Sequence, residues 1–147
     1  KDKMLKYPSS KWAIIDDNGQ SNTNLLAPVM YTDLDGTSKP AYPAAYNSKQ
    51  FGIAVNGYIT GFESGNWWLP SAREMYLLIK DALLDNSDIL NKTLTAISGD
   101  KVLASGYYPW TSTEYNAYTA WFYYGAIGYL NNDIKFNSYN VRSVTAF

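Results

Sequence analysis

Residues 106–147 read GYYPWTSTEYNAYTAWFYYGAIGYLNNDIKFNSYNVRSVTAF, and this stretch decides the fold. Within it, a set of scaffold-like residues forms a frame, and the sequence positions between them hold mostly Tyr, Asn, Phe, Ser and small residues. The frame consists of Trp110, Thr113, Glu114, Trp121, Gly128, Val141, Arg142, Val144 and Phe147. Tyr and Trp give large contact areas at low conformational cost, and Asn and Ser give adaptable hydrogen bonds, as in binding loops. The stretch predicts a surface that displays side chains to a ligand.

Four strands are expected in this stretch, at residues 110–113, 119–124, 127–130 and 141–146. Strand side chains alternate between two faces, so Trp121 and Tyr123 share one face and Phe122 and Tyr124 the other. With Trp121 in the core, Phe122 and Tyr124 are predicted to point outward. Two exposed aromatic side chains on one face normally signal a partner.

Two helices are expected before these strands. Ser71 and Glu74 form a capping box, and apolar residues then recur at helical spacing, which predicts an amphipathic helix over 71–84. A second helix is expected from Ser87 or Asp88 to Ile97. Because the helices come in one block and the strands in others, the fold class is α+β, with two helices packed against short antiparallel sheets.

The first sixty residues carry weaker signals. The apolar run at 11–15 predicts a strand, residues 20–47 read as a long ordered loop, and residues 51–60 predict a strand pair around Asn56-Gly57. The sequence DLDG at 33–36 is a fragment of a calcium loop without its later ligands, so a simple turn is favoured.

The length and composition of the chain limit its number of domains and the classes of partner that it can bind. The 147 residues predict one domain, 1–147, with 106–147 as its ligand-display segment. A net charge of -1 without a Lys/Arg run argues against nucleic acid as a partner. The chain has no apolar run of membrane-span length and no signal peptide, so we expect no membrane insertion. Because it begins at Lys1 without Met, we expect a mature form or an excised domain.

The chemistry available to the chain is limited as well. It has no Cys and no His, which excludes nucleophile triads with a His base, haem and iron–sulfur sites and most zinc sites within it. Glu63, Glu74 and Glu114 could in principle supply a glycosidase pair, but Glu74 is assigned to the cap. We therefore predict no enzyme, no cofactor and no metal site. Arg142 needs an anionic or carbonyl partner if buried, and Glu114 is the nearest candidate.

Several motifs resemble one family, the Lcl C-terminal domain family of surface proteins from gut Bacteroidetes. They are WWLPSARE at 67–74, ASGYY at 104–108, WTSTEY at 110–115, AW at 120–121 and VRSVTAF at 141–147. The resemblance covers about residues 60–147. It implies a C-type-lectin-like fold and a location outside the cell or on its surface.

This family is similar to the variable proteins of diversity-generating retroelements, in which a reverse transcriptase system randomises adenines in a C-terminal repeat. The altered residues then lie on the ligand face of the lectin-like fold. By this resemblance the ligand-binding positions are Asn116, Tyr118, Phe122, Tyr124, Ala126, Ile127, Tyr129, Asn131, Asn132, Asp133, Ile134, Phe136, Asn137, Tyr139 and Asn140. Each of these residues can arise by mutation of the two adenines of an Asn codon.

The chain departs from the family pattern at Pro109, Thr111 and Ser143. It lacks the Glu-Pro-Asn or Gln-Pro-Asp motif of calcium-dependent lectins, which argues against a calcium-bridged sugar site. The related formylglycine-generating enzymes need active-site cysteines, and this chain has none. The sequence therefore favours a non-enzymatic recognition domain for a protein ligand on another cell or phage. A fixed glycan ligand and a structural module of a surface or pilus-like assembly are the alternatives, and the oligomeric state stays open.

Overall fold

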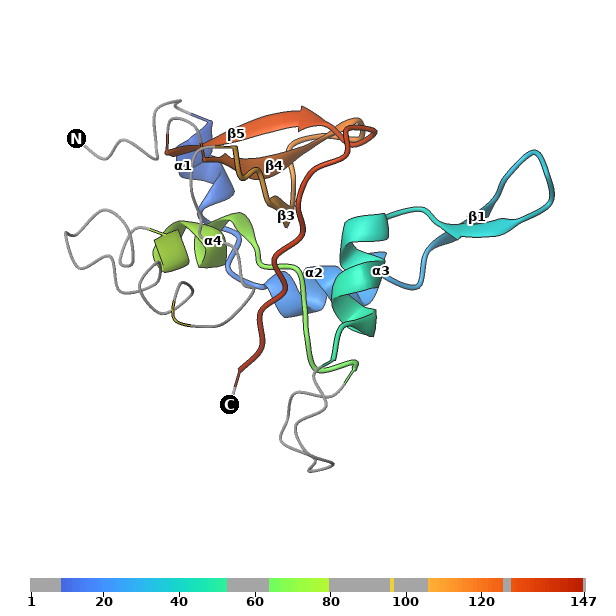
Figure 1. Ribbon diagram of the computed structural model, residues 1–147. Helices are drawn as coiled ribbons and strands as arrows, with labels where there is room; N and C mark the ends of the chain where they lie inside the picture. The colour runs from blue at the N-terminus through green and yellow to red at the C-terminus, as the bar shows by residue number, and fades with distance from the viewer. Residues whose placement is uncertain (1–8, 53–63, 80–95, 97–105, 126–127, 147) are drawn as a thin grey trace.

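The computed structural model describes residues 9–52, 64–79, 96, 106–125 and 128–146 (Figure 1). This part of the chain is α+β, as the sequence predicted. The described helices are α1 (Ser10–Ala13), α2 (Gly19–Leu26), α3 (Pro43–Gln50) and α4 (Ala72–Ile79). The described strands are β1 (Met30–Thr32), β2 (Ser38–Pro40), β3 (Trp110–Glu114), β4 (Thr119–Tyr124) and β5 (Tyr129–Ile134).

The central sheet is an antiparallel meander in the order β3-β4-β5. Its β4–β5 register runs from Thr119 opposite Ile134 to Tyr124 opposite Tyr129. The bounds predicted for β4 are confirmed, whereas β5 begins two residues later than expected. Gly128 explains this delay, because its φ of 70° belongs to the turn and not to a strand.

The strand predicted at 141–146 is wrong. Val144 forms a single antiparallel bridge with Trp68, in which each backbone N–H donates to the other's carbonyl at 2.9 Å. Pro70 lies two residues further along and has no N–H to donate, so the pairing cannot extend into a ladder. The C-terminal segment therefore crosses the body as an extended chain (Figure 1).

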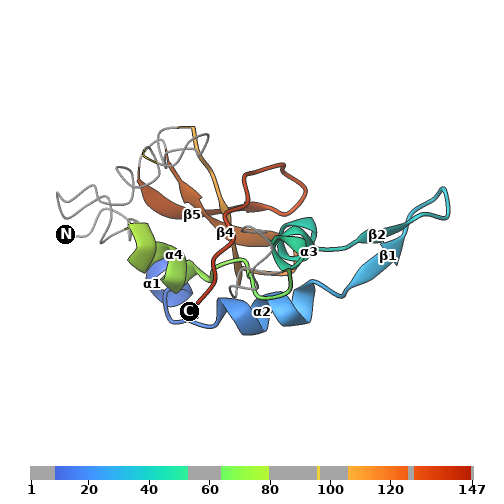
Figure 2. The same cartoon turned by 60° about the horizontal axis from the view of Figure 1, so that its bottom comes forward.

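One face of the sheet packs against α1 and α4, which lie on the same side of it in Figure 2. Trp121, Tyr123 and Leu130 form a single buried cluster with Met75 and Ile79 of α4. The predicted capping box is confirmed, because the Ser71 N–H donates to Glu74 Oε2 at 2.8 Å and the Glu74 N–H donates to Ser71 Oγ at 3.2 Å. Residues 80–84 of this predicted helix lie outside the described residues, as do those of the second predicted helix except Ala96, which is helical.

The other face of the sheet is also covered. The prediction that Phe122 points outward is wrong, because its side chain is only 3% exposed. Phe122 and Tyr124 do share this face, but Trp110, Leu69 and Tyr139 pack over it. The reason is that the chain after β5 folds back over the sheet, an arrangement that strand periodicity alone does not reveal.

The N-terminal predictions were mostly wrong. Residues 10–13 are helix α1 and not a strand, with Ser10 and Ala13 buried at helical spacing. The predicted long loop contains α2, α3 and a β1–β2 hairpin. Asn18 caps α2, since its side-chain oxygen accepts from the Ser21 N–H at 3.0 Å, and Pro43 begins α3.

The turn prediction for residues 33–36 is confirmed. The Gly36 N–H donates to the Asp33 carbonyl at 2.9 Å, and Gly36 has a φ of 80°. The resulting hairpin projects beyond α3 (Figures 1 and 2). Of the predicted strand pair at 51–60, residues 51–52 are not a strand and the rest lie outside the described residues. No helix among the described residues is long and apolar enough to cross a membrane.

Candidate functional site

Five aromatic side chains form a cluster on the sheet face opposite α4. We call Tyr108, Trp110, Phe122, Tyr124 and Tyr139 the aromatic cluster. The Tyr139 ring centroid lies 4.8 Å from that of Phe122 and 4.9 Å from that of Trp110, so Tyr139 closes the cluster from the segment after β5. Such tilted and edge-on pairs add to the stabilisation from apolar burial.

A cavity of about 290 Å³ opens beside this cluster, and we call it the α3 cavity. Residues 41–45 and Asn47 form one wall, residues 110–112 and Glu114 of β3 form another, and residues 135–139 and Val141 form the third. Leu26, Leu69, Trp110 and Val141 contribute apolar surface to its lining. The cavity is therefore built jointly by the N-terminal half and residues 106–147.

Asp133 fixes the third wall. Its Oδ2 accepts hydrogen bonds from the Tyr139 hydroxyl at 2.5 Å and from Asn137 Nδ2 at 2.8 Å. The bond from Tyr139 is the main reason that the pKa of Asp133 is lowered, and the same bond is the main reason that the pKa of Tyr139 is raised. These bonds hold Tyr139 between the cavity and the aromatic cluster.

An ion pair between Lys135 and Glu114 stands at the mouth of the cavity. Lys135 Nζ also donates to the Ala117 carbonyl at 3.1 Å and lies 5.6 Å from the ring centroid of Tyr42. Lys135 thus joins β3, the β3–β4 turn and the start of α3. The predicted pairing of Glu114 with Arg142 is wrong, because Glu114 pairs with Lys135.

The Arg142 side chain instead contacts the side chain of Tyr107. Its Nε donates to the Tyr107 hydroxyl at 3.2 Å, and its guanidinium carbon lies 5.7 Å from the ring centroid. Arg142 is half-buried and Tyr107 belongs to the core on the α4 side. The contact therefore links the C-terminal segment to this core.

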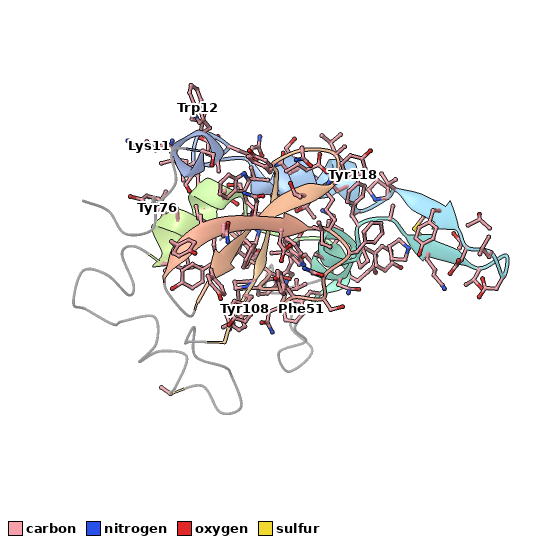
Figure 3. The ribbon with its side chains drawn as sticks, turned by 90° about the horizontal axis from the view of Figure 1, so that it is seen from above. Lys11, Trp12, Phe51, Tyr76, Tyr108 and Tyr118 are labelled. Carbon is pink, nitrogen blue, oxygen red and sulfur yellow. The ribbon has the colours of Figure 1, made fainter. Side chains whose placement is uncertain are left out.

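Large apolar side chains are exposed at one end of the sheet. Tyr118 in the β3–β4 turn is 75% exposed and Phe136 after β5 is 92% exposed. The Lys135 N–H donates to the Tyr118 carbonyl at 3.0 Å, which keeps the two segments together. We call Tyr115, Tyr118, Ile134 and Phe136 the exposed rim. Exposed aromatics also occur elsewhere, since Trp12 of α1 is 74% exposed and points away from the body (Figure 3).

The structure separates the predicted ligand-binding residues into groups. Phe136, Asn137 and Tyr139 line the α3 cavity, and Asn116, Tyr118 and Ile134 are exposed at the end of the sheet. Half-buried positions are Tyr124, Asn131, Asn132, Asp133 and Asn140. Phe122 and Tyr129 are buried and present almost no surface to a partner, while Ala126 and Ile127 lie outside the described residues.

Some of these residues also have structural tasks. Asn140 Oδ1 accepts from the Tyr108 N–H at 3.1 Å, and Asn116 Oδ1 accepts from the N–H groups of Tyr118 and Thr119 at 2.8 and 2.9 Å. The prediction missed Tyr42, Ala44 and Asn47 because their segment reads as a loop. Pro43, a residue favoured at the first position of a helix, was the available signal for α3.

Comparisons with protein-family models, curated proteins and solved structures found no match for this chain. Among the described residues, no group of three or more Asp and Glu side chains is arranged to hold a metal ion. The site consists of an apolar cavity, an ion pair whose two charges neutralise each other, and exposed aromatic side chains. This arrangement can bind a ligand through contact and hydrogen bonding.

Proposed function

We propose that this chain is a non-enzymatic recognition domain that binds a protein ligand on another cell or phage. The observation that carries the proposal is the exposed rim beside the α3 cavity. Tyr118 and Phe136, the most exposed members of the rim, belong to the stretch whose composition is typical of binding loops. Exposed aromatic side chains of this kind act as anchors when they are buried by a partner.

In the free protein the apolar side chains of the rim are in contact with water, and they contribute little to the stability of the fold. Phe136 is 92% exposed, so burial of its ring by a partner would remove nearly all of its apolar surface from water. Burial of a Phe side chain contributes about 1.5–3 kcal/mol, which is enough for an anchor in an interface. A ligand that also covers the ring of Tyr118 removes further apolar surface from water.

The finer fold assignment within the α+β class is part of the proposal. We propose a C-type-lectin-like fold of the Lcl C-terminal domain kind, located outside the bacterial cell or on its surface. Its support is that the family-like motifs meet in space: Leu69 and Trp110 share one buried cluster, and Val144 pairs with Trp68. The motif at 67–74 also supplies the confirmed capping box.

We further propose that the display segment is diversified, as in the variable proteins of diversity-generating retroelements. Positions with exposed side chains, such as Tyr118 and Phe136, tolerate exchange because they contribute little to the core. Phe122 is buried, so exchange there is restricted to residues that fill the same space.

Sequencing of the coding DNA for residues 107–147 and its flanks across a population tests the diversification. We expect adenine-specific variation at Asn-type codons, concentrated at the exposed positions, and a matching template repeat nearby. A uniform sequence without a template would contradict diversification and leave a receptor of fixed specificity.

The ligand class is tested by binding of the labelled domain to bacterial cells. A protein ligand predicts that protease treatment of the cells removes binding and that periodate oxidation of their sugars leaves it intact. The opposite pattern would favour the glycan alternative, for which the aromatic rings beside Asn137 supply the observation. Absence of binding to every cell type tested, including phage particles, would contradict a recognition role.

A further inference from the structure

The largest buried side chains in the lining of the α3 cavity are apolar, beside the smaller polar side chains of Thr111 and Ser112. Leu69 is 3% exposed and Trp110 is 7% exposed, and both contribute to the lining together with Val141. The cavity volume of about 290 Å³ lies near the lower limit for ligand pockets and suits one ring system. Size and lining therefore favour a single compact apolar group.

Three polar side chains of the walls already have hydrogen-bond partners. Asn137 Nδ2 and the Tyr139 hydroxyl both donate to Asp133, and Thr111 Oγ1 donates to the Trp121 carbonyl at 2.8 Å. A sugar hydroxyl placed at these three side chains would have to compete with these bonds, because buried polar groups without partners are costly. An apolar ring needs none of them.

The charged side chains of the lining also favour an apolar occupant. The two charged side chains of the lining, Glu114 and Lys135, form an ion pair with one another, so the mouth has no net charge. A charged ligand group would be desolvated in the cavity without a free counter-charge in its lining. The occupant that fits is neutral.

We propose that the α3 cavity receives one neutral aromatic side chain from the protein ligand, with Trp110, Leu69 and Val141 as its contacts. This inference rests on the proposed recognition of a protein and specifies how that protein is held. The aromatic side chain fills the cavity while the exposed rim covers the surface around it. A buried aromatic anchor surrounded by contacts that exclude water is the usual form of an interface hot spot.

Free indole and p-cresol, which carry the rings of Trp and Tyr, serve as probes with the full chain. Titration is followed by NMR of the methyl groups. We expect both probes to shift the methyl signals of Leu26, Leu69 and Val141, which line the cavity, and to leave those of Ile79 and Leu130, in the core on the other face, unchanged. Methyl α-glucopyranoside is the sugar probe and is expected to shift none of them.

Blocking variants test the location. Ala44→Phe fills the cavity from α3, and Ser138→Phe fills it from the opposite wall, so one remains informative if the other fails to fold. Gln50→Phe is the matched control, because it lies on α3, is exposed and does not line the cavity. We expect each folded blocking variant to bind indole at least about tenfold more weakly and Gln50→Phe to bind it as the natural chain does, since a tenfold change is 1.4 kcal/mol.

Two results would overturn the inference: shifts from the sugar without shifts from the aromatic probes, or no shift from any probe. Either result leaves the proposed function intact if the natural chain still binds cells through a protease-sensitive target. Conversely, indole binding to the cavity without any cell binding would support the cavity as an aromatic site and contradict the recognition of a protein.

Discussion

Tyr139 donates its hydroxyl hydrogen to Asp133 at 2.5 Å, and this bond links the wall of the α3 cavity to β5. The bond favours the ionised carboxyl and the protonated phenol. The pKa of Asp133 is consequently lowered from its ordinary value of 3.8, and the pKa of Tyr139 is raised from 10.0.

The first prediction concerns pH. A lowered pKa means that Asp133 contributes stability above its unfolded pKa and loses this contribution as the pH falls through the folded pKa. The raised pKa of Tyr139 adds a contribution that is present below about pH 10 and lost as the pH rises through the folded value. We expect Asp133→Asn to cost about 1 kcal/mol at pH 7 and to flatten the acid side of the stability profile, as measured by urea unfolding. An unchanged acid limb would contradict the assignment.

The second prediction compares two phenylalanines of the display segment. Phe122 is 3% exposed and Phe136 is 92% exposed. We expect Phe122→Ala to lower the free energy of unfolding by about 3–5 kcal/mol and Phe136→Ala to change it by less than about 0.5 kcal/mol. Chemical denaturation measures both. Equal effects would contradict the burial of Phe122 and the exposure of Phe136.

The third prediction concerns Gly19 at the start of α2. A Cβ atom there would lie 2.2 Å from Glu74 Oε2 and 2.5 Å from the Ser71 nitrogen, inside the capping box. We expect Gly19→Ala to destabilise the fold by about 1–3 kcal/mol through overpacking. Gln20→Ala, at the exposed neighbouring position, is the control and should have little effect in the same thermal unfolding experiment.

The fourth prediction concerns Thr113, which links three elements. Its Oγ1 donates to Asp16 Oδ2 at 2.6 Å and accepts from the Ala72 N–H at 2.8 Å. Thr113→Val removes both bonds and leaves the buried Ala72 N–H without a partner, while Asp16 Oδ2 keeps the bond from Asn22 Nδ2 at 2.7 Å, so we expect a loss of about 1–3 kcal/mol. The same substitution at Thr32, an exposed position in β1, controls for the change of side chain. Similar stabilities of the two variants would contradict the linking role.

Local patterns predicted the parts of the fold that depend on local physics. The capping box at Ser71 and Glu74, the limits of β4 and the sharing of faces between Phe122 and Tyr124 all follow from spacing. Whether a face is covered depends on distant segments, which is why the exposure of Phe122 was predicted wrongly. Helix α1 was missed because a short apolar run does not distinguish a strand from a buried helix.

The candidate site was predictable only in part. The composition of 106–147 pointed to the wall that contains Phe136, Asn137 and Tyr139, which does line the cavity. The opposite wall comes from α3, whose residues Tyr42 and Ala44 gave no signal of a site. A cavity formed between segments about ninety residues apart is a product of tertiary packing.

The most direct test of the recognition role is the binding of labelled Tyr118→Ala/Phe136→Ala to the cells that the natural chain binds. Both side chains are exposed, so the double variant should keep its stability and provide a clean comparison. Trp12→Ala, which removes an equally exposed aromatic ring on α1, is the matched control. We expect the double variant to bind at least about a hundredfold more weakly, because two anchors of more than about 1.4 kcal/mol each are lost, and the control to bind normally. Undiminished binding by the folded double variant would contradict the account.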